Sequence, residues 1–194
     1  MTEEMPQTRR PARARVLEAA GRLFYAEGVH AVGIDRIIAE AEVAKATFYH
    51  HFPSKDDLVR AYVTEQTSRQ RAAVAALPAA SPRETLEAVF AAMCDFGAGP
   101  GYRGCPYINA AVEYPDPAHP VRQAIDAQRR WLRDLYRDLL AADGHPDAER
   151  TADILLLLRD GLSVGFDLDD PAAVRPAVRE ALARVLGPVG AASR

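Results

Sequence analysis

The chain has 194 residues, of which 48% are hydrophobic and 26% are charged, and its formal net charge is −3. This composition is typical of a folded globular protein and argues against disorder along the whole chain. The slightly acidic balance excludes a general coat of positive charge for nonspecific nucleic-acid binding, although a local basic patch is still possible. No apolar run approaches the roughly 18–20 residues that span a bilayer, and residues 1–10 lack the apolar segment of a signal peptide. We therefore expect a cytoplasmic protein with no membrane partner.

Strong helix formers dominate the chain, above all alanine, leucine and arginine, and no stretch alternates apolar and polar residues as a strand does. Glycine and proline mark helix ends: Gly28 follows the first expected helix, Pro53 follows the third, and Pro106 opens the sixth. The sequence therefore predicts an all-α fold. The nine expected helices cover residues 8–27, 34–40, 45–51, 54–77, 82–96, 106–114, 121–142, 146–166 and 171–186.

Two of the expected helices, 34–40 and 45–51, are short and separated by a tight turn, which is the arrangement of a helix-turn-helix unit. The helix before them carries five arginines against two glutamates, so it forms a local basic patch. The second short helix is too short and too polar to be a good core element. Its outer face offers hydrogen-bond donors for phosphates or base edges. These donors are Lys45, Thr47, Tyr49 and His50. The alternative is that they form only a solvated helix face.

The run from Val43 to Leu58, VAKATFYHHFPSKDDL, resembles the signature of TetR-type (TetR/AcrR) transcriptional regulators. The resemblance covers about residues 9–63. It implies an all-α homodimer with an N-terminal three-helix helix-turn-helix DNA-binding module and a C-terminal helical ligand-binding and dimerisation domain. On this basis we expect the DNA-binding domain at residues 1–52 and the ligand-binding and dimerisation domain at residues 53–194.

Carried over by position, the resemblance implies that Lys45 and Thr47 face base edges. It also implies that Tyr49 and Lys55 contact phosphates, with His50 close to the DNA backbone. Arginines of the basic patch and of the first short helix are expected to add phosphate contacts. The expected DNA-binding set is Arg13, Arg36, Lys45, Thr47, Tyr49, His50 and Lys55.

Two positions depart from the family pattern, while Phe48 and Phe52 fit it as inward-packing residues. The turn commonly holds glycine where this chain has Glu42, so a left-handed backbone there would cost ~1 kcal/mol. Gly33 precedes the first short helix where threonine or serine is common, and glycine supplies no hydroxyl to a phosphate.

Aromatic and polar residues between positions 90 and 131 are candidates for a mostly apolar effector pocket with a few orienting polar groups. Asn109 and Glu113 are four residues apart on one helix and suit the orienting role. For each aromatic residue taken alone, simple core packing is the alternative, and for Glu113 the alternative is an exposed or salt-bridged position. The expected ligand-binding set is Met93, Phe96, Cys105, Tyr107, Asn109, Glu113 and Trp131.

Cys105 precedes an expected helix N-terminus, where the helix dipole and free amides favour a thiolate. A reactive thiol there would sense electrophiles or oxidants, whereas the alternative is a small buried residue. With only two cysteines in the chain, a disulfide framework is not expected.

The two last expected helices are candidates for an isologous four-helix dimer contact, because the run 154–158 is apolar around most of the helix. Burial within one protomer is the alternative. The expected dimer residues are Leu155, Leu162, Val178 and Leu182.

No catalytic motif, metal-ligand spacing or cofactor motif is recognisable, so we expect neither an enzyme nor a bound metal or cofactor. The leading hypothesis is a repressor that binds a near-palindromic double-stranded DNA operator as a homodimer and is released by a small-molecule effector. The alternative is a helical small-molecule or electrophile-sensing protein that uses Cys105 and lacks sequence-specific DNA binding. A small helical enzyme comes third.

Overall fold

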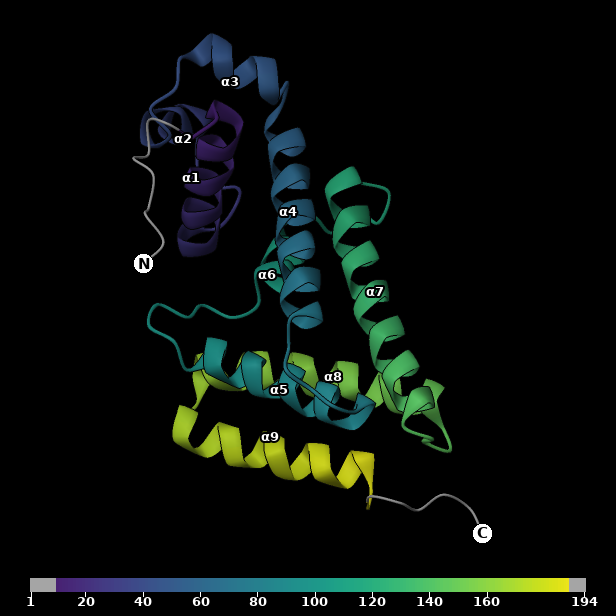
Figure 1. Cartoon of the computed structure of the whole chain (residues 1–194). Helices are drawn as coiled ribbons and strands as arrows, with labels where there is room; N and C mark the ends of the chain where they lie inside the picture. Colours follow the sequence, from purple (N-terminus) through teal and green to yellow (C-terminus); the bar gives the residue numbers. More distant parts are fainter. Residues whose placement is uncertain (1–9, 189–194) are drawn as a thin grey trace. The chain divides into compact units, whose positions relative to one another are not determined.

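The computed structural model describes residues 10–188, which form nine α-helices and no strand (Figure 1). All nine predicted helices are present, with ends that differ by a few residues at most. The expected start of the first helix at Thr8 and the end of the C-terminal tail lie outside the described residues, and the helix begins after Pro11. The helices are α1 (Ala12–Glu27), α2 (Ile34–Glu40), α3 (Lys45–His51), α4 (Lys55–Ala75), α5 (Pro82–Gly97), α6 (Pro106–Glu113), α7 (Pro120–Ala142), α8 (Ala148–Leu168) and α9 (Pro171–Leu186).

The helices fall into two compact units. The first contains the described residues up to 68 together with 106–125, and the second contains 69–105 together with the described residues from 126 onward. The first unit therefore differs from the domain expected at residues 1–52, because it also holds the first part of α4, all of α6 and the start of α7.

Apolar side chains of α1 form the centre of the first unit. Val16 and Ala20 are fully buried, and the Phe24 ring meets Tyr62 of α4 edge-on at 5.8 Å between ring centroids. Gly21 lies on the same side of α1, where an added Cβ would come within 3.2 Å of the Tyr62 ring. Close packing of this kind explains why the beginning of α4 belongs to the same compact unit as the helices before it.

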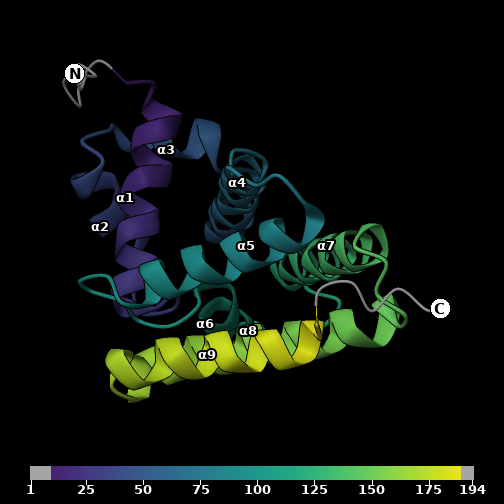
Figure 2. The same ribbon diagram turned by 60° about the horizontal axis from the view of Figure 1, so that its bottom comes forward.

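The second unit is an α-helical bundle in which α5 and α9 both pack against α8 (Figure 2). Its core includes a stacked pair, Phe90 of α5 and Tyr136 of α7, with 5.7 Å between the ring centroids. Gly97 ends α5 against Phe166, and an added Cβ would lie only 2.5 Å from that ring. No helix within residues 10–188 has the length and apolar character needed to cross a membrane.

The four residues expected at a dimer contact are buried. Each belongs to the core of the second unit and is at most 6% exposed, so burial within the protomer, the alternative, accounts for their apolar character. These residues are Leu155, Leu162, Val178 and Leu182. A different face of α8 is exposed and apolar, and its side chains are Ile154, Leu157, Val164 and Leu168, which are 42%, 67%, 51% and 75% exposed.

Candidate functional site

The turn between α2 and α3 sets the position of the third helix. The amide of Val43 donates to the carbonyl of Ile38, and the amide of Glu42 donates to that of Ala39, which together form the Schellman arrangement that ends a helix. Glu42 has φ 51° and is the one non-glycine residue with a positive φ in the described part of the chain. This turn therefore needs a residue with a left-handed backbone, and the chain has a glutamate there instead of the common glycine.

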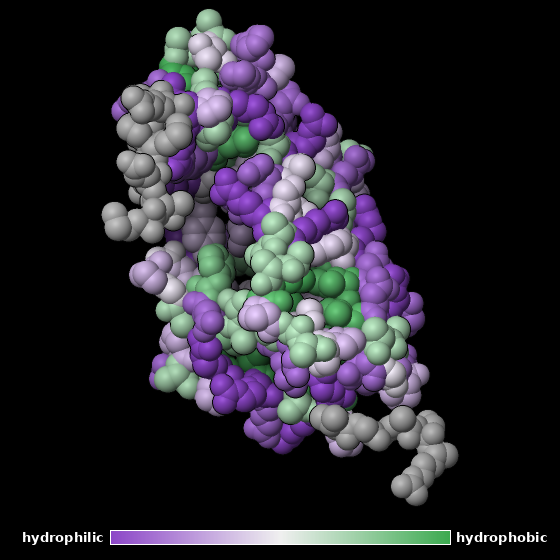
Figure 3. Space-filling model, in the orientation of Figure 1, coloured by the Kyte–Doolittle hydropathy of each residue, from purple (hydrophilic) through white to green (hydrophobic). Residues whose placement is uncertain are grey.

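Alternate sides of α3 face inward and outward, as expected. Phe48 is fully buried, and Phe52 just after the helix is 2% exposed. Lys45, Tyr49 and His50 are exposed, and Tyr49 is held edge-on against Phe48 at 5.2 Å between centroids. In Figure 3 this end of the module, at the top, mixes polar and apolar side chains. The helix thus presents a small set of hydrogen-bonding groups on a rigidly packed base.

Thr47 departs from the expected outward set because it is half-buried. Its neighbours on either side, Ala46 and Phe48, are exposed and buried respectively. Thr47 therefore lies at the edge of the exposed face of α3.

Two expected DNA-binding cations are already paired with carboxylates. Lys45 Nζ lies 3.0 Å from Asp35 Oδ1, and this hydrogen bond raises the pKa of Lys45. Arg36 forms a two-point pair with Glu27, which raises the pKa of Arg36 in the same way. Neither carboxylate partner could be predicted from the sequence, because each pairing depends on how separate helices cross.

Two further cations of the expected DNA-binding set, Lys55 and Arg13, contact other groups of the module. Lys55 is half-buried with its Nζ 3.4 Å from the carbonyl of His30, and burial lowers its pKa although Glu113 opposes the shift. The Arg13 guanidinium lies over the Phe52 ring, 5.5 Å from its centroid. Lys55 at the start of α4 and Arg13 of α1 thus each contact another part of the module, although Arg13 is still exposed.

Glu113, expected to orient an effector, makes contacts within the first unit. Its carboxylate accepts hydrogen bonds from the backbone amides of Val29 at 2.7 Å and His30 at 2.5 Å, and His30 Nδ1 lies 3.3 Å away. These amides belong to the connection between α1 and α2. Glu113 therefore fastens the end of α6 to the helix-turn-helix, and its carboxylate is already occupied.

Tyr114 makes a second attachment of the α6 segment within the first unit. Its hydroxyl donates to Asp56 at 3.0 Å, at the start of α4, and burial raises its pKa. His119 lies 3.3 Å from the other oxygen of Asp56 and packs on the Tyr114 ring. Sequence reasoning missed this cluster, since its members are up to 63 positions apart.

The expected ligand-binding residues are divided between the two units. Tyr107, Asn109 and Glu113 belong to the first, whereas the other four belong to the second. Tyr107 is buried, Asn109 is exposed, Phe96 is 57% exposed, and Trp131 carries Arg71 over its ring at 5.0 Å from the centroid. Met93 is half-buried against the core of the second unit. Asn109 and Glu113 line one small pocket of the first unit, and the effector site formed by the full set stays a prediction.

Cys105 is 5% exposed, and its Sγ accepts a hydrogen bond from Arg159 Nη2 at 2.8 Å. The same guanidinium bonds Asp160 at 2.8 Å, and Asp160 pairs with Arg129 at 2.6 Å. Burial lowers the pKa of Arg159, but Cys105 and Asp160 outweigh it, so the net shift is upward and the guanidinium stays charged. This enclosed setting matches the packing alternative for Cys105 better than an open, reactive thiol.

Two family models match the chain. The model described as "Bacterial regulatory proteins, tetR family" matches residues 16–62, and the model described as "Tetracyclin repressor-like, C-terminal domain" matches residues 82–160. The first match covers α1 to α3 and the start of α4. The second covers α5 through most of α8.

A crystal structure of a TetR-family transcriptional regulator from Streptomyces coelicolor is 44% identical to this chain. It superposes with a TM-score of 0.86 over 90% of this chain and 94% of that one. The HTH-type transcriptional regulator LmrA of Bacillus subtilis is 30% identical over 69% of this chain and 73% of its own length. The HTH-type transcriptional activator FasR of Mycolicibacterium smegmatis is 32% identical over 71% of this chain and 63% of its own length.

Proposed function

The chain belongs to the TetR family of bacterial transcriptional regulators, and we propose that it is a repressor that binds a near-palindromic operator as a homodimer. The observation that carries this proposal is the face of α3. Lys45, Tyr49 and His50 are exposed on a helix whose other side is fixed by Phe48. Such a helix suits the major groove, where lysine and hydroxyl groups contact base edges and phosphates.

A second copy of the chain is the proposed partner for the exposed apolar face of α8. The stripe has spacings of three, seven and four residues between Ile154, Leu157, Val164 and Leu168. Gly161 lies in the seven-residue interval, and the space where its side chain would be is open. This repeat gives one continuous stripe along a helix, as in helix pairs that pack on each other. A twofold contact through this stripe would supply the second recognition helix that a palindrome requires.

Release by a small-molecule effector completes the proposal. The effector would favour a state in which the two recognition helices no longer match adjacent major grooves, which lie about 34 Å apart. The expected loss of DNA affinity is the coupling energy between the two sites, typically ~1–3 kcal/mol. We propose repression because the C-terminal part matches a tetracycline-repressor-like model, although the relative FasR is an activator. We propose a cytoplasmic location, because the proposed action is on DNA.

The experiment is a mobility-shift titration with fragments from the region upstream of the protein's own gene. Tyr49→Phe and Lys55→Ala should weaken binding to all sequences, whereas Lys45→Ala should also reduce discrimination between bases. Arg184→Ala is the matched control, because that exposed arginine on α9 pairs only with Glu180 in the described structure. Equal affinity of the wild type and a triple alanine variant at positions 45, 49 and 55 would refute the DNA-binding face.

The proposed dimer contact has its own test. Leu157→Glu places a charge in the middle of the exposed stripe and should give a folded monomer in sedimentation velocity, with operator binding reduced along with dimerisation. Glu149→Gln, at an exposed position near the start of α8 and outside the stripe, is the control. An unchanged dimer in the Leu157 variant would place the contact elsewhere.

A second candidate function is thiol sensing by Cys105, which the short contact with Arg159 favours. The test is the rate of iodoacetamide modification in Cys94→Ala protein, which leaves one thiol. Modification of the native protein near the rate of the unfolded chain, with loss of operator binding, supports sensing. Protection by several orders of magnitude supports packing instead.

A further inference from the structure

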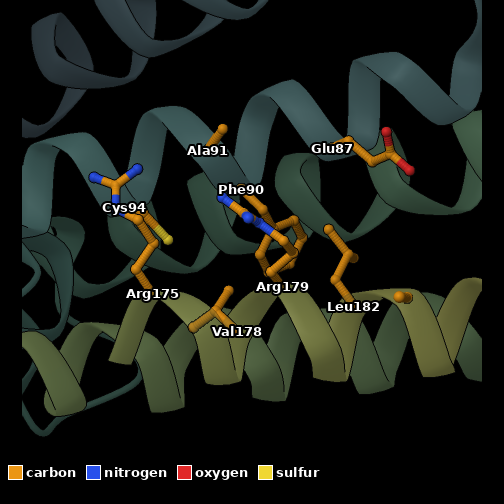
Figure 4. Close-up of a pocket in the computed structure, with 9 residues that line it drawn as sticks. Glu87, Phe90, Ala91, Cys94, Arg175, Val178, Arg179 and Leu182 are labelled. Atoms are coloured by element: carbon orange, nitrogen blue, oxygen red, sulfur yellow. The ribbon is translucent and has the colours of Figure 1, made fainter. Parts of the chain in front are cut away.

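A groove of about 350 Å³ lies between α5 and α9 within the second unit (Figure 4). Phe90 of α5 and Val178 and Leu182 of α9 make its floor apolar. The two helices run antiparallel here, so Arg175 lies across from Cys94 at one end and Leu182 lies across from Glu87 at the other. The volume is at the lower end of the range of small-molecule sites, roughly 300–1,000 Å³.

Two guanidinium groups of α9 extend over this floor. Arg175 is held by Asp95 at 2.7 Å. Arg179 has no hydrogen bond or ion pair within residues 10–188, and Figure 4 shows it reaching over Phe90. Burial raises the pKa of the Cys94 thiol; Arg175 and Arg179 oppose that shift, whereas Asp95 adds to it. Within residues 10–188, Arg179 is thus the groove arginine that has no carboxylate partner, and it lies beside an apolar floor.

Glu87 makes the two ends of the groove differ in charge. It is exposed on α5 at the end away from Arg175, and it too lacks an ion pair in the described part of the chain. An anionic group is therefore favoured near the arginines and disfavoured near Glu87. A ligand with one carboxylate and an apolar body matches this pattern, whereas a ligand with a carboxylate at each end does not.

The floor also argues for a small molecule over a protein partner. Phe90, Val178 and Leu182 are each at most 6% exposed. A stable protein interface needs about 800 Å² from each partner, which so recessed a floor cannot supply. An apolar body lying in the groove would contact the exposed edges of these side chains and the exposed Ala91 beside them.

We propose that the groove between α5 and α9 binds a small amphipathic monocarboxylate, with its carboxylate at Arg179 and its apolar body on Phe90, Val178 and Leu182. Binding itself requires no DNA. Only the consequence that such an acid acts as an effector rests on the proposed function.

The experiment is isothermal titration calorimetry on the full-length, DNA-free protein, with octanoate, octan-1-ol and octanedioate as probes. Octanoate should bind once per chain, and octan-1-ol about tenfold more weakly, because a hydrogen bond to a charged group is lost. Arg179→Ala should weaken octanoate binding by a similar factor. Arg184→Ala, an exposed arginine of the same helix outside the groove, should leave it unchanged.

Octanedioate tests the direction of the groove. The wild type should bind octanedioate more weakly than it binds octanoate. Glu87→Gln should reduce the ratio of these two affinities severalfold. Thermal melting of each variant checks that it is folded. The comparison of octanoate with octan-1-ol uses only the wild type, so the proposal stays testable if a variant is unstable.

Three results would overturn the proposal: no saturable octanoate binding, equal affinity for octanoate and octan-1-ol, or no effect of Arg179→Ala. A change in oligomeric state on Arg179→Ala, measured by sedimentation, would instead make the groove a contact between copies and would also reject it. Operator binding by the same preparation is measured separately, so failure of the groove and failure of the regulator proposal are distinguishable.

Discussion

Glu42→Gly should stabilise the protein, because position 42 has a left-handed backbone that glycine adopts without steric cost. The observed φ is 51°, and the residue closes the turn that joins α2 to α3. A side chain in this conformation costs roughly 1–2 kcal/mol, while glycine loses about 0.5–1 kcal/mol more backbone entropy on folding. The expected net gain is about 1 kcal/mol, which for a chain of this length raises Tm by about 2–4 °C.

Loss of the glutamate charge is a second effect of the same substitution, so a matched variant is needed. Glu42→Gln removes the charge but keeps a side chain in the left-handed conformation, and its Tm should stay near that of the wild type. Glu42→Asn should lie between the two, because asparagine tolerates this region better than most residues. Thermal unfolding followed by circular dichroism measures all three.

The reasoning is refuted if the glycine variant melts no higher than the glutamine variant. Arg15 does not confuse the comparison, since its guanidinium donates to the carbonyl of residue 42 at 3.0 Å and that carbonyl is present in every variant. DNA affinity offers an independent measurement: glycine and glutamine variants should both bind more tightly than the wild type and to a similar extent, because both remove a carboxylate near the phosphates.

The other predictions concern carboxylates. Asp35→Asn should raise DNA affinity severalfold in mobility shifts, because it frees Lys45 and removes a negative charge beside α3; unchanged affinity would mean that the pair is irrelevant to binding. Glu113→Gln should lower stability by about 2 kcal/mol, and Tm by about 4–8 °C, because charge-assisted bonds to two amides are weakened; an unchanged Tm would contradict this. Burial opposes but does not outweigh the arginine hydrogen bonds that lower the pKa of Asp160 in the folded protein. Its stabilising contribution is therefore present above the unfolded value near 3.9 and is lost as pH falls through the folded value. The Tm of Asp160→Asn should fall below that of the wild type at pH 7 and approach it below about pH 4.

Local signals in the sequence predicted the helices and the recognition module well. Pro53 and Gly28 end helices through their own backbone preferences, and the spacing of Ile34, Ile37 and Ala41 identifies the buried side of α2. The inward position of Phe48 was also predicted correctly, because neighbouring positions on a short helix face different ways. These features depend on residues within a few positions of each other.

The apolar run on α8 shows where local pattern stops being decisive. Residues 154–158 are apolar on every side of the helix, so the sequence alone does not say which side packs within the protomer. Packing against α5 and α9 buries Leu155 and leaves Ile154 and Leu157 outside. The choice depends on the position of two other helices, so the sequence alone could not decide between burial and a dimer contact.

The hydrogen bonds of Glu113 could not be predicted for a related reason. Its partners, the amides of Val29 and His30, lie more than 80 positions earlier in the chain. Backbone amides are present at every residue except proline, so no residue type in the sequence marks these two as unsatisfied. The sequence position of a carboxylate that binds a ligand does not differ from that of a carboxylate that binds backbone amides, so only the folded structure distinguishes them.

The ion pairs on the proposed DNA face bear on selectivity as well as affinity. Lys45 must leave Asp35 before it can contact DNA, and Arg36 must leave Glu27. At a nonspecific site, the lysine or arginine exchanges a carboxylate for a phosphate, so the binding free energy gains little from the exchange. A guanine edge adds acceptors that only the correct sequence presents, and it can repay the broken pair. Self-pairing of the cations therefore weakens binding to wrong sites more than binding to the operator. It follows that Asp35→Asn should raise nonspecific affinity by a larger factor than operator affinity, and the ratio of the two should fall.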